Sequence, residues 1–111
     1  MDRICKGLKG LVAVLFERED GRVTAYDGNQ EVGKIIYKEK EEVWDAVGCY
    51  VEIDYRGQKI ADRLLAHLVE WAEEEEKSIY PTCSYVLAKF DRRPEDYQTV
   101  DARKNNEQNE Q

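Results

Sequence analysis

Apolar residues recur at helical spacing near the middle of the chain. They are Ile60, Ala61, Leu64, Leu65, Leu68 and Ala72. Asp62 and Arg63 fall outside that face, so the pattern predicts an amphipathic helix with one buried side. The acidic run from Glu73 to Glu76 follows, where negative charge is unfavourable because a helix carries its negative end there. We therefore expect a helix that starts at Ile60 and frays in its last turn.

The segment before this helix alternates between apolar and polar residues, which is typical of a strand with one buried face. The predicted buried face consists of Val43, Val47, Cys49, Val51 and Ile53, with Asp45 as a polar interruption. This is the clearest strand in the sequence.

Three shorter strands are indicated by β-branched and aromatic residues between turn residues. They run from Arg22 to Tyr26, from Val32 to Lys38 and from Ser78 to Tyr80, where Pro81 ends the last one. A strand, helix, strand unit normally makes a right-handed crossover between parallel strands. The sequence therefore predicts an α/β fold with a mixed, mostly antiparallel sheet and a β-α-β crossover.

The two ends of the chain give weaker patterns. One helical face near the start would hold Ile4, Leu8, Leu11, Val12, Leu15 and Phe16. The run from Leu11 to Phe16 fits a buried strand equally well, and we favour the helix. Thr82 is a candidate cap for a helix reaching about Phe90, and Pro94 for the start of a short last helix. The tail from Arg103 onwards lacks apolar residues to bury.

The predicted organisation has three parts. Residues 1–21 form an N-terminal extension, residues 22–102 form the domain, and residues 103–111 form a disordered tail. A chain of 111 residues is long enough for one core and too short for two independent ones.

The net charge of the chain argues against some classes of binding partner. The chain has 24 acidic and 17 basic residues, and its net charge of -7 repels phosphate backbones and anionic lipid. We therefore expect neither a nucleic acid nor a membrane as partner. No apolar run approaches the roughly 20 residues of a membrane span, and the first residues lack the order of a signal peptide. Both features favour a location in the cytosol.

Cysteine and histidine are too few for a disulfide framework or a zinc site of the usual kind. Cys5, Cys49 and Cys83 are odd in number and far apart, and His67 is the one histidine. We expect reduced thiols, no metal, and a half-packed His67 on the edge of the helix.

The turn Tyr55-Arg56-Gly57-Gln58-Lys59 leads from the clearest strand into the helix. The first N–H groups of a helix lack partners and lie at its positive end. With Gly57 for close approach and basic side chains alongside, this turn suits a diphosphate. An ordinary turn with solvated basic residues has the same spacing, so the residues alone leave both interpretations open.

The segment from Val51 to Leu65 resembles the acyl-CoA-binding segment of the GNAT superfamily of N-acetyltransferases. The motif there is Arg or Gln, two residues, Gly, one residue, then Gly or Ala. Arg56 and Ala61 match its ends, whereas Lys59 replaces the usual glycine. The stretches 79–85 and 94–98 are similar to the compact, single-domain branch of that superfamily.

This resemblance implies an acyltransferase with acetyl-CoA as donor and an amine of a small molecule or a protein as acceptor. The implied coenzyme contacts are Val51, Glu52, Ile53, Arg56, Gly57, Gln58, Lys59, Ile60 and Ala61. The backbone of the first three would pair with the amides of pantetheine. The sequence leaves the acceptor and the oligomeric state open.

Three residues are candidates for catalysis. The compact branch has a cysteine at the place of Cys83, which implies an acyl-cysteine intermediate, although a structural cysteine is the commoner case. Glu52 is a candidate base for an ammonium acceptor, and Tyr85 a candidate proton donor to the leaving thiolate.

One departure from the compact branch bears on catalysis. Its members typically carry Asp-His-Thr where this chain has Val47-Gly48-Cys49, so an ionisable group beside the acyl site is absent. The alternative function is therefore a non-catalytic acyl-CoA-binding or regulatory module. A plain interaction domain that ignores coenzyme A is a third interpretation.

Overall fold

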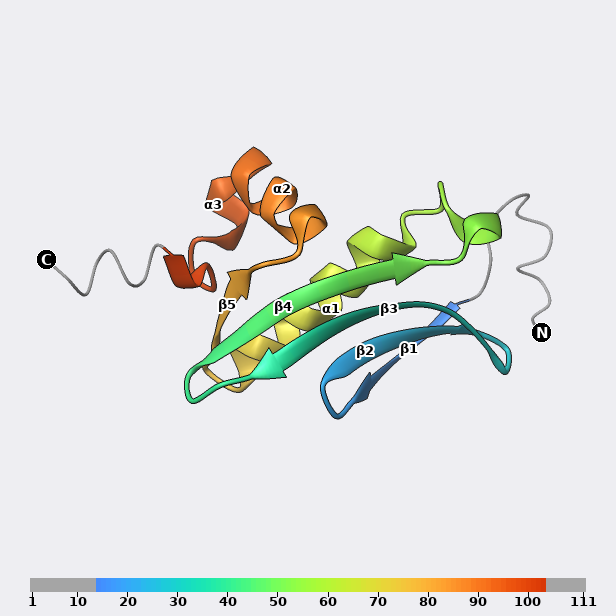
Figure 1. Ribbon diagram of the computed structural model, residues 1–111, viewed down its shortest axis with the longest axis horizontal. Coiled ribbons are helices and arrows are strands. Elements are labelled where there is room, and N and C mark those ends of the chain that lie inside the picture. The colour runs from blue at the N-terminus through green and yellow to red at the C-terminus, as the bar shows by residue number, and fades with distance from the viewer. Residues whose placement is uncertain (1–13, 104–111) are drawn as a thin grey trace, which may run out of the picture.

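The computed structural model describes residues 14–103, and its five strands form one sheet in their order along the chain (Figure 1). They are β1 (Val14–Glu19), β2 (Arg22–Asp27), β3 (Gln30–Glu39), β4 (Val43–Val51) and β5 (Ser78–Pro81). The first four are antiparallel neighbours, and β5 is parallel to β4. The predicted mixed, mostly antiparallel α/β fold is confirmed.

The helix α1 (Ile60–Glu74) connects β4 to β5 and lies across one face of the sheet (Figure 1). Five residues of its predicted apolar stripe are at most 2% exposed: Ile60, Leu64, Leu65, Leu68 and Ala72. Burial of each of the larger side chains contributes about 1.5–3 kcal/mol. His67 is half-buried on the edge of this helix, as predicted, and its ring stacks on Phe16 at 4.7 Å.

A 3-10 turn and two further helices complete the described chain. They are η2 (Ile53–Tyr55), α2 (Ser84–Arg92) and α3 (Pro94–Tyr97). Thr82 does not cap α2, because its hydroxyl donates to Asp45 instead, and Cys83 occupies the cap position. Within residues 14–103, no helix is both long and apolar enough to cross a membrane.

The helix favoured for the start of the chain is wrong where the structure describes it. Val14–Glu19 forms the strand β1, which pairs with β2 along its whole length, so the sheet begins before Arg22. The helical pattern places Leu15 on the buried face, but on the strand its side chain is 59% exposed. A tight turn at Gly21, with φ +83°, brings the two strands together. Residues 4–13 of the predicted helix lie outside the described residues.

A β-bulge in β4 changes which of its residues are buried. The pairing with β3 passes from Tyr37↔Ala46 to Ile36↔Gly48, so Val47 is an extra residue in β4. Because side chains alternate between faces, an extra residue exchanges the faces of all residues beyond it.

The predicted buried face of β4 is therefore right only for the end of the strand. Cys49 and Val51 pack against the core. At the start of the strand the buried residue is Trp44, which is 3% exposed, and Val43 lies on the opposite face. Ile53 is 72% exposed in η2.

The tail was predicted to begin at Arg103, but Arg103 is ordered by ion pairs. Its guanidinium lies 2.9 Å from the carboxylate of Asp101 and 3.2 Å from that of Asp91. Asp101 is 1% exposed and forms a bridge with Ile79 at the edge of β5. The rest of the predicted tail lies outside the described residues.

Arg103→Met should destabilise the fold by about 3 kcal/mol, because it leaves the buried Asp101 carboxylate without its counter-charge. Arg93→Met is the matched control, since the Arg93–Asp96 pair is exposed, and it should cost less than about 1 kcal/mol. Urea unfolding of both variants measures the difference. Equal losses would show that Arg103 does not neutralise a buried charge.

Candidate functional site

The strands β4 and β5 part at Ala46. Their parallel pairing runs from Val43↔Ser78 to Ala46↔Pro81, and the N–H of Cys83 then donates to the Ala46 carbonyl at 2.7 Å. Pro81 has no N–H to extend the ladder, and α2 turns the chain away. The stretch 47–51 of β4 thus has an edge with which no strand of the described residues pairs.

The backbone of β4 presents alternate peptide groups to this open edge. The N–H of Glu52 donates to the Val32 carbonyl of β3 at 2.8 Å. Since peptide groups alternate in direction along a strand, those of Val51 and Cys49 point towards the gap. The Nε of Arg56 donates to the Val51 carbonyl at 3.1 Å, which leaves the Val51 N–H facing the gap.

The three residues predicted to pair with pantetheine differ in the hydrogen bonds of their backbone groups. The N–H of Val51 faces the gap, and its carbonyl accepts from Arg56. Glu52 has its N–H engaged by β3, and the Ile53 carbonyl accepts from the Arg56 N–H within η2. The side chain of Cys49 packs against the core as predicted, and its backbone lies on the open edge of β4.

The turn between β4 and α1 contains two residues in left-handed conformation. Gly57 has φ +88° and Lys59, the cap residue of α1, has φ +60°. A Cβ at Gly57 would meet no protein atom within 4 Å, so the space beside it is open. The glycine that the GNAT motif has in place of Lys59 adopts this conformation without strain.

The first turn of α1 is open to a ligand. The first intrahelical bond runs from the Arg63 N–H to the Lys59 carbonyl, so the N–H groups of the residues before Arg63 have no acceptor within the helix. A cavity of about 1080 Å³ extends from this turn to the open edge of β4, a size usual for a ligand site.

Most of the predicted site residues line this cavity. Those that do are Val51, Glu52, Ile53, Arg56, Gly57, Lys59, Ile60, Ala61 and Tyr85. Gln58 and Cys83 are half-buried outside its lining. Cys83 instead lies at the apex of the gap, where β4 and β5 separate.

The thiol of Cys49 also lines the cavity, and its environment suppresses its reactivity. Burial first, and then the proximity of Cys83 and Asp62, raise the pKa of Cys49 to about 12. This thiol is therefore protonated at neutral pH and a poor nucleophile.

Asp62 lines the cavity and forms an ion pair with Lys89, and neither residue is among the predicted site residues. The carboxylate of Asp62, in the first turn of α1, accepts a hydrogen bond from the Tyr85 hydroxyl and lies 2.8 Å from the Nζ of Lys89 in α2. Asp62 had been assigned to the solvated side of the helix. No sequence signal links it to α2, because the contact is formed by the tertiary fold.

The described residues thus form a split mixed sheet with the first turn of a helix at the mouth of the split. The family model of GCN5-related N-acetyl-transferases matches residues 22–100. The chain belongs to this family, which confirms the resemblance to the compact GNAT branch and supports acyl transfer as its general activity.

Solved structures similar to this chain include two proteins described as N-acetyltransferases. A GCN5-like protein of Staphylococcus aureus superposes with a TM-score of 0.63 at 22% identity, over 78% of this chain and 85% of its own. The ribosomal-protein-alanine N-acetyltransferase of Brucella melitensis biovar Abortus 2308 gives 0.56 at 22% identity, over 64% of this chain and 58% of its own. These likenesses establish the fold. No curated protein matches the sequence.

Lys59→Gly should raise the free energy of unfolding by about 0.5–1 kcal/mol, because glycine relieves the cost of a left-handed residue. Glu76→Gly should act alike, since Glu76 also has φ +60°. Lys77→Gly serves as the control without positive φ and should not stabilise. Urea unfolding is the measurement, and destabilisation by Lys59→Gly would contradict the geometry of this turn.

Cys83 should react with iodoacetamide faster than Cys49 at pH 8, because a pKa of about 12 leaves only on the order of one Cys49 thiolate in ten thousand. Mass spectrometry of each cysteine peptide over time gives both rates. Equal rates in the folded protein would show that the Cys49 thiol is not held protonated.

Proposed function

We propose that the protein binds acetyl-CoA and transfers its acetyl group to an amine. One observation carries this proposal: the open edge of β4 leads from the first turn of α1 to the point where β4 and β5 part. That edge offers hydrogen bonds along a line, and the helix turn offers an anion site at one end of it. An extended ligand with a diphosphate and amide groups matches this order.

The anionic part of the coenzyme is assigned to the turn 56–61. Unpaired N–H groups at the positive end of α1 favour a phosphate. Arg56 and Lys59 add positive charge beside them, and the open space at Gly57 admits a close approach. The net charge of -7 therefore does not argue against an anionic ligand at this place.

The pantetheine part is assigned to the edge of β4. An extended chain pairs with an exposed strand edge as an added strand would, and the groups of Val51 and Cys49 that face the gap are available for this. The thioester would then lie near Cys49 and Tyr85, which line the inner part of the same cavity as the α1 turn.

We favour direct attack by the amine over an acyl-cysteine. The amine nitrogen attacks the thioester carbon, the C–S bond breaks, and the CoA thiolate takes up a proton. Cys83 lies outside the lining of the cavity, which supports a packing role for it. Glu52 is exposed on the cavity rim, where its carboxylate can take a proton from an incoming ammonium group. We expect this reaction in the cytosol, with a small-molecule or protein amine.

Acetyl-CoA should stabilise the protein by about 2.7 kcal/mol at a hundredfold excess over its dissociation constant, because it binds the native state alone. CoA should act similarly, and ATP at equal concentration less. Thermal unfolding measures this. Turnover is then followed by mass spectrometry of products with spermidine, a lysine-containing peptide and a peptide with a free N-terminus.

The outcomes separate the competing functions. Stabilisation together with an acetylated product supports the proposal. Stabilisation without any product favours the non-catalytic acyl-CoA-binding module. If no CoA species stabilises the protein, the proposal that it binds the coenzyme is wrong. Full turnover by Cys83→Ala would support direct attack, whereas its loss with CoA binding intact would favour the acyl-cysteine route.

A further inference from the structure

Three side chains from two helices meet at the inner end of the cavity. The Oδ1 of Asp62 in α1 accepts from the hydroxyl of Tyr85 in α2, and the Nζ of Lys89 lies 2.8 Å from the same oxygen. The Nζ of Lys89 also lies 5.8 Å from the centre of the Tyr85 ring. Asp62 and Tyr85 line the cavity beside Cys49.

The protonation states of this cluster are fixed near neutral pH. Burial alone would raise the pKa of the Asp62 carboxyl, but the hydrogen bonds from Lys89 and Tyr85 outweigh burial and hold that pKa below its usual value. Burial first, and then the bond to Asp62, raise the pKa of Tyr85 well above its usual value. Asp62 is thus a carboxylate, and Tyr85 is a neutral phenol.

These states determine the direction of the hydrogen bond. An ionised carboxylate only accepts, so the phenolic proton of Tyr85 must point to Asp62. The lone pairs of the Tyr85 oxygen then remain for a second partner. In this arrangement Tyr85 is poorly suited to the role of proton donor that the sequence analysis gave it, because its proton is already engaged.

We propose that Asp62 is a positioning residue for acyl transfer, which holds the Tyr85 hydroxyl so that its oxygen accepts an N–H from the attacking amine. This inference rests on the proposed function and names the residue that orients the nucleophile. Tyr85 is the group that touches the amine, and Asp62 acts through it. Lys89 keeps Asp62 charged and in place.

The reaction balances without a proton from Tyr85. As the neutral amine attacks, a C–N bond forms, and the nitrogen keeps both hydrogens and becomes positive. Its N–H donates to the Tyr85 oxygen more strongly as this charge develops. The C–S bond then breaks with its electron pair on sulfur, and the surplus proton on nitrogen passes through water in the open cavity to the thiolate.

Asp62→Ala and Tyr85→Phe should each lower kcat at least tenfold on the best amine of the panel, with KM for acetyl-CoA changed less than threefold. The double variant should be no slower than Tyr85→Phe, because the two residues act as one unit. Asp62→Asn keeps an acceptor oxygen and should recover part of the loss. Asp96→Asn, a carboxylate on α3 that is paired with Arg93, is the matched control and should leave kcat unchanged.

A pH profile of Lys89→Met separates positioning from a merely structural role. Without Lys89 the pKa of Asp62 rises above its value in the wild type, so the ratio of variant to wild-type kcat should fall as the pH is lowered and Asp62 takes up a proton first in the variant. The ratio cancels the ionisation of the amine itself. The other charged or titratable groups near Asp62 are Tyr85, Cys49, Lys59 and Tyr97. In the Asp62→Asn, Lys89→Met double variant the pH dependence of the ratio should vanish.

Wild-type kcat in Asp62→Ala, or a flat ratio for Lys89→Met, would overturn the role of Asp62 and leave the proposed function standing. Absence of turnover by the wild type with every amine would overturn both. If Asp62→Ala fails to fold, the role of Asp62 is still tested by comparing the pH dependence of Lys89→Met with that of the Asp62→Asn, Lys89→Met double variant.

Discussion

The loss of hydrogen bonding between β4 and β5 beyond Ala46 is the constraint on which the rest of the structure depends. An unpaired strand edge inside a sheet exposes donors and acceptors that must find other partners. Pro81 cannot supply a donor, and the N–H of Cys83 takes the last carbonyl before the gap. Because α1 follows β4 in a β-α-β unit, its positive end lies at the open end of the same strand. One interruption therefore produces both the open edge of β4 and the open first turn of α1 beside it.

Because of the bulge at Val47, different sets of side chains on β4 face α1 before and after this residue. Before the bulge, Trp44 packs against Tyr37 at 4.4 Å and Trp71 at 5.1 Å and anchors the closed part of the sheet beneath α1. Beyond the bulge the faces exchange, and the Cys49 side chain reaches the cavity. A regular strand would place that side chain on the uncovered face. The hydrogen bond from Tyr85 to Asp62 then ties α2 to the first turn of α1 and gives the inner end of the gap a fixed polar wall.

The sequence predicts the periodic parts of this fold and misses the parts made by single residues. The stripe of α1 and the antiparallel strands follow from repeated apolar positions. The bulge depends on one extra residue in pairing with β3, and the alternation around Val47 carries no sign of it. The prediction of a helix at Leu15 and Phe16 is wrong because a short apolar run fits the period of a helix and that of a strand equally well. In the site, the turn at Arg56 follows from its motif, whereas Asp62 meets Tyr85 only in the folded chain.

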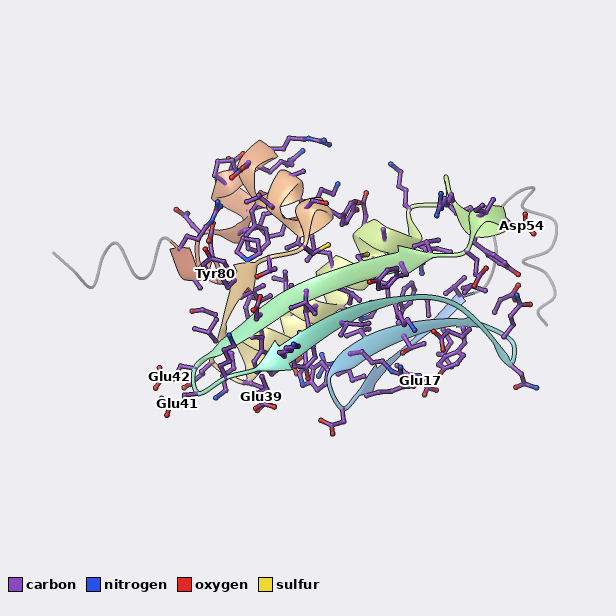
Figure 2. The ribbon with its side chains drawn as sticks, in the orientation of Figure 1. Glu17, Glu39, Glu41, Glu42, Asp54 and Tyr80 are labelled. Carbon is purple, nitrogen blue, oxygen red and sulfur yellow. The ribbon has the colours of Figure 1, made fainter. Side chains whose placement is uncertain are left out.

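The charge distribution explains how a protein of net charge -7 keeps a positive site. Figure 2 shows Glu39, Glu41 and Glu42 gathered at the β3–β4 turn. The C-terminal end of α1 lies there too, since the amine of Lys77 donates to the Glu41 carbonyl. Acids at this end of α1 weaken the helix, but they lie at the end away from the turn 56–61. The acid in the first turn of α1 is Asp62, and its ion pair with Lys89 neutralises it. No unpaired acid in the first turn of α1 therefore offsets its positive end, so the ion pair between α1 and α2 also keeps that end of the helix positive.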